Sequence, residues 1–370
     1  MTYKSTLLRR SGAVEAGGLD AGVAAHYGDP YREQRLLAGV HVAAAQGKNL
    51  TAVVDLSHRG VVTVSGPDRL SWLNTLSSAQ LTDLAPGVST ELLLLSIQGR
   101  IEHDVRVLDD GATTWLIVEA AEAAPLAAWL TGMRFMLRVE VADVSGLWAV
   151  AGTVNPVTEW SERLCWRDPW PHIAPGGFAY TAVPEESHPG LDRSWFEYLI
   201  PMADLDAAVG VRPLAGSWAA EALRIAAWRP RLGAETDDKT IPHELDLLRT
   251  AVHLAKGCYK GQETVARVHN LGHPPRRLVF LQLDGSQHTL PAAGSAVLLG
   301  ERQVGTVTSV AQHFEMGPIA LAVIKRTVDP AAELTVLDAG EKYVAAQETI
   351  VAPDAGQVVG RQTGFLRVPR

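Results

Sequence analysis

Apolar residues recur along the chain at spacings of two or of three to four, in short runs separated by polar breaks. Residues 51–66, TAVVDLSHRGVVTVSG, hold two β-branched runs around the break DLSHRG, which predicts a pair of strands. Residues 89–120 predict three strands, and the Asp-Asp-Gly break before the third is typical of a hairpin. Helices are predicted at 33–40, 66–78, 123–133, 217–233 (stopped by Pro230) and 263–271, and a strand at 135–145.

The pattern changes after HPPRR, residues 273–277, because two consecutive prolines cannot continue a helix. The remaining chain consists of short apolar runs divided by glycine turns, which predicts a small β-barrel or sandwich. Residues 151–195 are rich in Pro, Trp and Gly and predict loops, and residues 243–254 are predicted as partly helical or extended. The predicted fold class is therefore α+β, with a mixed body over residues 1–272 and a β domain over residues 273–370.

Composition narrows the class of protein. Hydrophobic residues make up 47% of the 370 residues and charged residues 20%, as in ordinary globular proteins. A net charge of −8 argues against a general nucleic-acid binder. Two cysteines cannot form a disulfide framework and fit a reducing compartment. The sequence shows no signal-peptide pattern and no run of about 18 apolar residues, so we expect a cytoplasmic protein that does not bind membranes.

The stretch KGCYKGQE, residues 256–263, sets Cys258 between two lysines and two glycines. Nearby cations lower the pKa of a thiol, and glycines allow close approach or a positive φ. This pattern indicates an exposed, nucleophilic or metal-contacting thiol. The alternative, which has about equal weight from spacing alone, is a small apolar residue at a helix start beside solvated lysines.

Two other polar stretches carry possible chemistry. Asp55, Ser57 and His58 in DLSHRG resemble a hydrolytic triad in composition, but adjacent residues cannot easily converge on one spot, and a capped turn is the better interpretation. In QGRIEHDVRV, residues 98–107, the alternation of a strand places Glu102, Asp104 and Arg106 on one face. Such a face can hold a ligand amine, or it can be a surface ladder of ion pairs.

Metal and nucleotide sites have little support. His253, Cys258, His269 and His273 are close in sequence, but the chain has no C-x-x-C or H-E-x-x-H motif, and no metal site is predicted. It also lacks a Walker loop and the cysteines that an iron–sulfur cluster of its own would need.

KGCYKGQE closely resembles the signature K-G-C-[FY]-x-G-Q-E of the YgfZ/GcvT-like folate-binding proteins, relatives of the glycine-cleavage T-protein aminomethyltransferase. Further stretches resemble T-protein segments in the same order along residues 26–330: 53–81, 98–107, 195–201, 222–244 and 305–326. The resemblance implies a three-lobed, T-protein-like arrangement of two α/β lobes around a folate channel plus a C-terminal β-barrel. Tetrahydrofolate, or a related folate, is the implied cofactor.

The resemblance also implies site residues. Asp104 matches the T-protein's catalytic aspartate, Glu197 matches a glutamate that contacts the pterin, and Cys258 matches the defining thiol of the YgfZ branch. The signature adds Lys256, Gly257, Tyr259 and Gln262 as folate-binding candidates, and Arg224 can hold a carboxylate in a bidentate pair. His103 and Ala226 depart from the T-protein pattern, and that enzyme lacks the cysteine, which favours a retained folate cleft over retained aminomethyl transfer.

Three hypotheses follow. The first is a tetrahydrofolate-binding accessory protein for assembly or repair of iron–sulfur enzymes, acting through Cys258, with client enzymes or cluster-assembly proteins as partners. The second is a tetrahydrofolate-dependent one-carbon transferase with Asp104 as its key carboxylate. The third is a scaffold that has lost its ligand and works through protein contacts.

Overall fold

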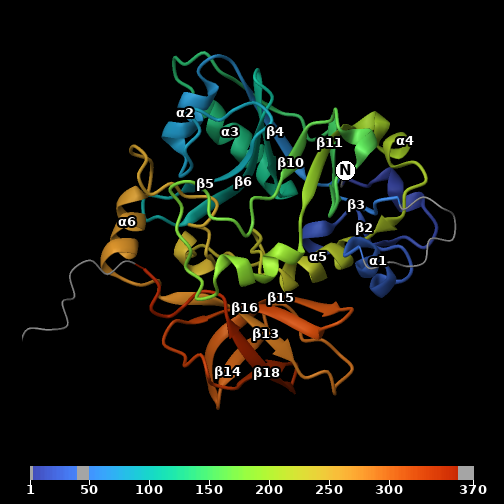
Figure 1. The fold of residues 1–370 in the computed structure, drawn as a ribbon, viewed down its shortest axis with the longest axis vertical. Coiled ribbons are helices and arrows are strands. Elements are labelled where there is room, and N and C mark those ends of the chain that lie inside the picture. Colours follow the sequence, from blue (N-terminus) through green and yellow to red (C-terminus); the bar gives the residue numbers. More distant parts are fainter. Residues whose placement is uncertain (1–2, 40–49, 357–370) are drawn as a thin grey trace, which may run out of the picture.

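Three lobes meet around a common centre in the computed structural model, which describes residues 3–39 and 50–356 (Figure 1). A five-stranded sheet with two helices forms the first lobe, and a second five-stranded sheet with three helices forms the second. The C-terminal part closes into a barrel below both lobes in Figure 1. The structure thus confirms an α+β fold with two α/β lobes and a C-terminal β-barrel.

The first lobe is an antiparallel sheet in the order β5-β6-β7-β4-β8. Its elements are β4 Gly60–Ser65, α2 Arg69–Leu76, β5 Ser89–Leu95, β6 Ile101–Asp109, β7 Thr113–Val118, α3 Ala123–Met133 and β8 Glu140–Asp143. One sheet face packs its aliphatic residues against α2 and α3, with Leu126 and Leu130 of α3 fully buried. The predicted strand at 135–145 is shorter than expected, since only β8 is extended.

The predicted Asp-Asp-Gly hairpin joins β6 to β7. The Oδ1 atom of Asp110 accepts the backbone N–H groups of Ala112 and Thr113, and Gly111 adopts a φ of +97° that favours glycine. The turn chemistry is entirely local, which explains why the sequence pattern predicted this hairpin correctly.

The second lobe has the strand order β10-β11-β9-β3-β12. Its elements are α1 Pro30–Leu37, β3 Val53–Asp55, β9 Trp148–Thr153, β10 Cys165–Arg167, β11 Phe196–Pro201, α4 Leu205–Val209, β12 Leu214–Ala215 and α5 Ser217–Ala226. A two-stranded sheet, β1 Val14–Glu15 with β2 Ala24–His26, lies near the N-terminus. The predicted helix at 33–40 corresponds to α1, and its last residue lies outside the described residues.

The two runs in residues 51–66 are strands, but the prediction that they pair with each other is wrong. β3 belongs to the second lobe and β4 to the first. The DLSHRG break is a turn that carries the chain between lobes, in which Oδ1 of Asp55 accepts the N–H and O–H of Ser57 at 3.0 and 2.5 Å. The interpretation as a capped turn is confirmed.

Helix α5 ends at Ala226, four residues before the proline predicted to stop it. Trp228 takes a φ of +58°, a left-handed conformation that a helix cannot contain. The side chain of Arg224 donates to the carbonyl of Arg229 at 2.7 Å and so fastens this early turn to the helix. The segment after α5 is thereby directed into the centre of the molecule.

Residues 243–254 form a short 3-10 turn, η8 Pro242–Leu245, followed by irregular turns, and α6 Gln262–Leu271 agrees with the helix predicted at 263–271. The predicted division at residues 272/273 falls between α6 and the first barrel strand. The outer ends of the two predicted regions, residues 1 and 370, lie outside the described residues.

The C-terminal strands form a closed barrel in the order β13-β16-β15-β14-β17-β18, which decides between the predicted barrel and sandwich. Its strands are β13 Arg276–Leu283, β14 Ala296–Leu299, β15 Arg302–His313, β16 Gly317–Lys325, β17 Leu334–Asp338 and β18 Glu341–Thr349. Alternate residues of β13 serve two cores: Val279 and Leu281 fill the barrel, whereas Leu278 and Phe280 join the core shared with the lobes.

Candidate functional site

Cys258 is exposed, in the turn that precedes α6. Gly261, the N-cap residue of α6, has a φ of +86°, and a Cβ atom there would lie 2.5 Å from the carbonyl oxygen of Ser96 at the tip of the β5–β6 hairpin. Gly257 faces open space, with nothing within 4 Å of such a Cβ atom. The cysteine turn is therefore fixed against the hairpin at Gly261 and open to solvent beside Cys258.

The two lysines of the motif bind other groups. Lys256 is buried, and its Nζ atom donates to the carbonyl oxygens of Asn74, Ser77 (2.5 Å) and Ala79 (2.9 Å) at the C-terminal end of α2. Burial lowers the pKa of Lys256 to about 8. Lys260 pairs with Glu102 of β6 at 2.9 Å. Both lysines thus hold the turn onto the first lobe.

Tyr259 and Gln262 support the same turn from inside. Tyr259 is buried, which raises its pKa to about 12, and the Nζ atom of Lys256 lies 5.1 Å from its ring centroid. The Nε2 atom of Gln262 donates to the carbonyl of Lys256 at 3.3 Å. These contacts shape the cysteine turn, and the folate-binding role of the four motif residues stays a prediction.

Strand β6 connects the cysteine turn with the centre of the molecule. Glu102 pairs with Lys260, Asp104 lies beside Glu91 of β5, and Arg106 lies 3.5 Å from Glu197. The strand face that carries Glu102, Asp104 and Arg106 is therefore charged along its length. Only its Glu102 end forms an exposed ion pair, with Lys260.

Asp104 differs from an ordinary aspartate. Its Oδ1 atom is buried, and its carboxyl group shares a side-chain hydrogen bond with that of Glu91. Burial and the neighbouring carboxylate of Glu91 raise the pKa of Asp104 well above its usual value. Asp104 therefore holds its proton to a higher pH than a solvated aspartate does, while Glu91 stays ionised beside Arg229, 2.6 Å away.

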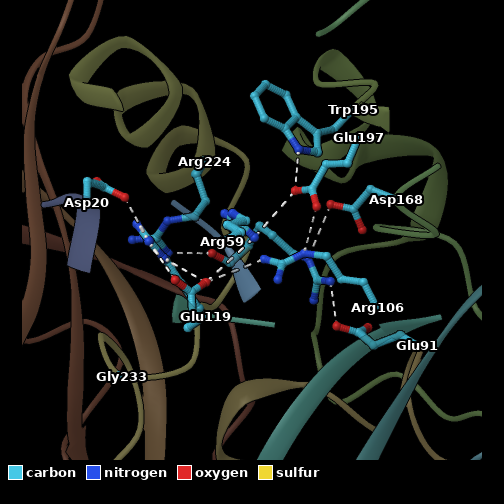
Figure 2. A network of polar contacts seen from close by, with 12 residues as sticks. Asp20, Arg59, Glu91, Arg106, Glu119, Asp168, Trp195, Glu197, Arg224 and Gly233 are labelled. Carbon is cyan, nitrogen blue, oxygen red and sulfur yellow. Dashed lines mark hydrogen bonds and ion pairs between the residues drawn. The ribbon is translucent and has the colours of Figure 1, made fainter. Parts of the chain in front are cut away.

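Glu197 lies at the centre of the molecule, almost completely buried on β11 (Figure 2). Its Oε1 atom accepts the indole N–H of Trp195 at 3.0 Å and lies 3.4 Å from Nη1 of Arg59. Burial alone would raise the pKa of Glu197, but Arg106 and Arg59 outweigh it and hold that pKa below its usual value. Both arginines also contact Glu119, at 3.6 and 3.7 Å.

The donors of Arg224 are used within the protein. Its guanidinium group binds Glu221 at 2.8 Å, Glu235 at 2.9 Å and the hydroxyl of Ser309 in the barrel at 2.7 Å. A folate carboxylate would have to displace these partners to reach Arg224. Arg224 thus joins α5 to the barrel in this structure.

The structure brings Glu197 and Arg224 into one network of ion pairs and Asp104 beside a second, and Arg224 joins the two through the carbonyl of Arg229. We call the two networks together the charged centre. Its other members are Asp20, Arg59, Glu91, Arg106, Glu119, Asp168, Arg193, Glu221, Arg229, Arg231 and Glu235. Cys258 is not a member. Most of these residues were missed from sequence, and the one available signal was WRPR, residues 228–231, which sets two arginines beside a proline directly after the Arg224 helix.

Four cavities in the described part of the chain are lined by members of this centre, and one of them, of about 670 Å³, meets it only at Glu235 on the barrel side. The smallest, about 30 Å³, is lined by Arg59, Glu197 and Arg229 among others. A cavity of about 760 Å³ lies beside it and shares Asp168, and another of about 820 Å³ shares Arg193. Asp168 and Arg193 pair at 3.3 Å, so this ion pair divides the two large cavities from the small one.

The larger cavities differ in their surroundings. The cavity of about 760 Å³ reaches Ala79 and His253 near the cysteine turn and includes Thr90, Cys165 and Phe196. The cavity of about 820 Å³ lies towards the barrel, beside Trp228, Phe280 and Phe314. Both fall within the volumes of small-molecule sites.

Neither a metal-binding group nor a membrane-spanning helix occurs among the described residues. Within residues 3–39 and 50–356, no three His, Cys, Asp or Glu side chains gather as a metal-binding group. His269 contacts the hydroxyl of Tyr180 instead, and His273 contacts a backbone carbonyl. Over the same residues, no helix combines the length and apolar character needed to cross a bilayer.

Comparison with known proteins identifies the class. Residues 12–157 match the GCVT N-terminal domain, and residues 276–363 match the glycine cleavage T-protein C-terminal barrel domain. The chain belongs to this GcvT-like family. The crystal structure of glycine cleavage system aminomethyltransferase T from Bartonella henselae superposes with a TM-score of 0.71 at 18% identity, covering 95% of this chain and 97% of that one. This match confirms the T-protein-like arrangement of the lobes.

Relatives within the family carry different names. An aminomethyltransferase from Nostoc sp. is 28% identical over 298 residues, covering 75% of this chain and 77% of its own. A mitochondrial homologue of the iron–sulfur cluster assembly factor IBA57 from Chaetomium globosum is 28% identical over 293 residues, covering 71% of this chain and 62% of its own. Identity to the two is the same, so it does not choose between their functions.

Proposed function

We propose that this chain is a tetrahydrofolate-binding accessory protein for the assembly or repair of iron–sulfur enzymes, of the YgfZ type. The observation that carries the proposal is an exposed thiol, Cys258, on a turn that Gly261 and Lys256 fix to the first lobe. A reactive thiol must be accessible, and a fixed turn keeps it in one place relative to a bound ligand. The name of the Chaetomium globosum relative supports the same role.

The cavity of about 760 Å³ is our proposed folate site. Lys256, two residues before Cys258, donates to the carbonyl of Ala79, which lines this cavity, and His253 of the same segment lines it as well. Apolar groups such as Phe196 and polar groups such as Thr250 and Asp168 line it together, which fits a planar, amide-rich ring. The pterin could not reach Glu197 without rearranging the charged centre, because the cavity at Glu197 has a volume of only about 30 Å³.

Each part of the proposal has its own test. Anaerobic calorimetry should show tetrahydrofolate binding to the wild type and equally to Cys258→Ser. In a deletion strain, Cys258→Ser should fail to restore iron–sulfur enzyme activity, because a hydroxyl cannot replace a thiolate as nucleophile or metal ligand. Cys165→Ser tests the other thiol, whose pKa burial raises to about 11. Because Cys165 lines the proposed folate site, the tetrahydrofolate affinity of this variant is measured too, and at unchanged affinity it should restore activity. Full rescue by Cys258→Ser would remove the thiol from the proposal.

A one-carbon transferase is the second candidate, and Asp104 favours it. A buried carboxyl group with a raised pKa, hydrogen-bonded to a second carboxylate, is suited to proton transfer. The transferase predicts that Asp104→Ala eliminates product formation from an aminomethyl donor, whose carbon passes to tetrahydrofolate at the methylene level as ammonia leaves. Absence of 5,10-methylene-tetrahydrofolate with every donor tried would reject it.

Calorimetry also separates both candidates from a scaffold that binds no folate, since the scaffold predicts no heat of tetrahydrofolate binding by the wild type. We propose the cytoplasm as the compartment, on the low cysteine content. Fractionation of the native cells with an organelle marker would test this.

A further inference from the structure

The small cavity in the charged centre is lined by more arginines than carboxylates. The four carboxylates that line it are already paired: Asp20 with Arg231, Asp168 with Arg193 and Arg229, Glu197 with Arg59 and Arg106, and Glu221 with Arg224 and Arg231. The volume of about 30 Å³ exceeds the roughly 10–15 Å³ that one water molecule requires. The cavity is thus large enough for a few atoms and far too small for a pterin.

Several guanidinium donors around this cavity have no acceptor. Nε and Nη1 of Arg59, Nε of Arg193 and Nη1 of Arg229 are buried, and none of these atoms forms a hydrogen bond within the described residues. The nearest carboxylate oxygens to Arg59 lie at 3.4 and 3.6 Å, beyond a good charge-assisted hydrogen bond. Arg59 and Arg229 are 6% and 5% exposed, so bulk water does not satisfy them.

The electrostatics agree with this geometry. Burial and the neighbouring Arg106 lower the pKa of Arg59, and burial lowers that of Arg193 to about 10 despite the opposing effect of Asp168. The charged forms of Arg59 and Arg193 are therefore less stabilised than those of Arg106, Arg224, Arg229 and Arg231, whose pKa values are raised. An anion in this cavity would supply acceptors for the unpaired donors and would stabilise the charges of Arg59 and Arg193.

We propose that this cavity binds a small planar oxyanion of the size of formate or bicarbonate. The oxygens of such an anion can accept the N–H groups that Arg59, Arg193 and Arg229 leave unpaired, from three different segments of the chain. The anion would lie beside the Asp168–Arg193 ion pair, where the two larger cavities approach each other. The inference rests on the charged centre and does not require the proposed folate function.

Calorimetric titration with sodium formate at constant ionic strength tests the site. The wild type should bind one formate per chain, and Arg59→Met should bind it about tenfold or more weakly, because charged hydrogen bonds are lost. Arg302→Met removes an exposed arginine of the barrel and should bind as the wild type does. Equal binding by all three proteins would overturn the proposal, as would no binding by the wild type.

A crystal structure of the wild type soaked in formate covers the case in which Arg59→Met fails to fold. Planar density in contact with the three guanidinium groups supports the site, and water molecules only would overturn it.

Tetrahydrofolate titrations with and without saturating formate distinguish a free anion from the glutamate carboxylate of folate. Independent binding supports the proposal, and full competition would assign the cavity to folate itself. Formate binding without any tetrahydrofolate binding would reject the proposed function and leave this site intact.

Discussion

Gly261 has the most restricted backbone of the cysteine turn. An alanine there would adopt a left-handed conformation at φ +86° and would place its Cβ atom 2.5 Å from the Ser96 carbonyl. Gly261→Ala should therefore lower the free energy of unfolding by about 1–3 kcal/mol and loosen the turn. Urea unfolding measures this change, and Cys258 accessibility to a thiol reagent should rise with it.

Gly257 provides the control, since its surroundings are open and its φ is not positive. Gly257→Ala should unfold within about 0.5 kcal/mol of the wild type. If both glycine variants are equally stable, the close contact between the cysteine turn and the β5–β6 hairpin is not a feature of the protein in solution.

At the scale of elements, strands β5 and β6 carry a pair of carboxyl groups in different protonation states. Glu91 is ionised beside Arg229, whereas Asp104 holds its proton because burial and Glu91 raise its pKa. Glu91→Gln leaves Arg229 without this charged partner and should lower the free energy of unfolding by about 3 kcal/mol or more. Asp104→Asn replaces one neutral group by another and should lower it by less than about 1 kcal/mol. Urea unfolding at pH 7 compares them, and the reverse order of stabilities would contradict this assignment.

The junction of η8 with α6 should be sensitive to acid. His243 is fully buried, its Nε2 atom lies 3.1 Å from the Val265 carbonyl of α6, and burial lowers its pKa from 6.5 to about 3. Between these values the unfolded chain binds a proton that the folded chain does not, so stability falls as the pH falls. Between pH 6.5 and pH 5, protonation of His243 in the unfolded chain should lower the free energy of unfolding by about 2 kcal/mol.

The variant His243→Gln removes this titration while its amide can still donate to the Val265 carbonyl. Stability measured against pH should therefore slope less steeply for the variant than for the wild type between pH 5 and 6.5. His188, whose pKa burial lowers to about 4, titrates in both proteins and cancels in the comparison. If the stability of the wild type and of His243→Gln changed with pH at the same slope, His243 would have the same pKa in the folded and the unfolded chain.

Which elements could be predicted from sequence depended on how local their determinants are. The β6–β7 turn was predictable because Asp110 and Gly111 contain its chemistry. The partner of β3 was not, because periodicity identifies a strand without saying which strand lies beside it. For the same reason the charged centre was largely missed: Arg59, Glu119 and Arg229 come from separate segments and meet only through the packing of the lobes.

At the scale of the whole molecule, one core joins all three lobes. It includes Leu93 of the first lobe, Ile225 of α5, and Phe280 and Leu321 of the barrel. A barrel separated from the lobes would expose the outward side chains of β13 and β16 to water. The barrel and lobes should therefore unfold together rather than as independent domains.

Strand β13 allows a direct test, because neighbouring residues serve different cores. Phe280→Ala removes a ring from the shared core and should lower the free energy of unfolding by about 3–5 kcal/mol. Val279→Ala removes two methyl groups inside the barrel and should lower it by about 1–3 kcal/mol. Both variants should shift one cooperative transition, seen alike by tryptophan fluorescence, which reports on the lobes, and by circular dichroism, which includes the barrel. Separate transitions for the two signals in Phe280→Ala would show that the lobes fold without the barrel. Arg224 reaches Ser309 across the same junction. A single transition would therefore also mean that the charged centre is complete only while the barrel is docked.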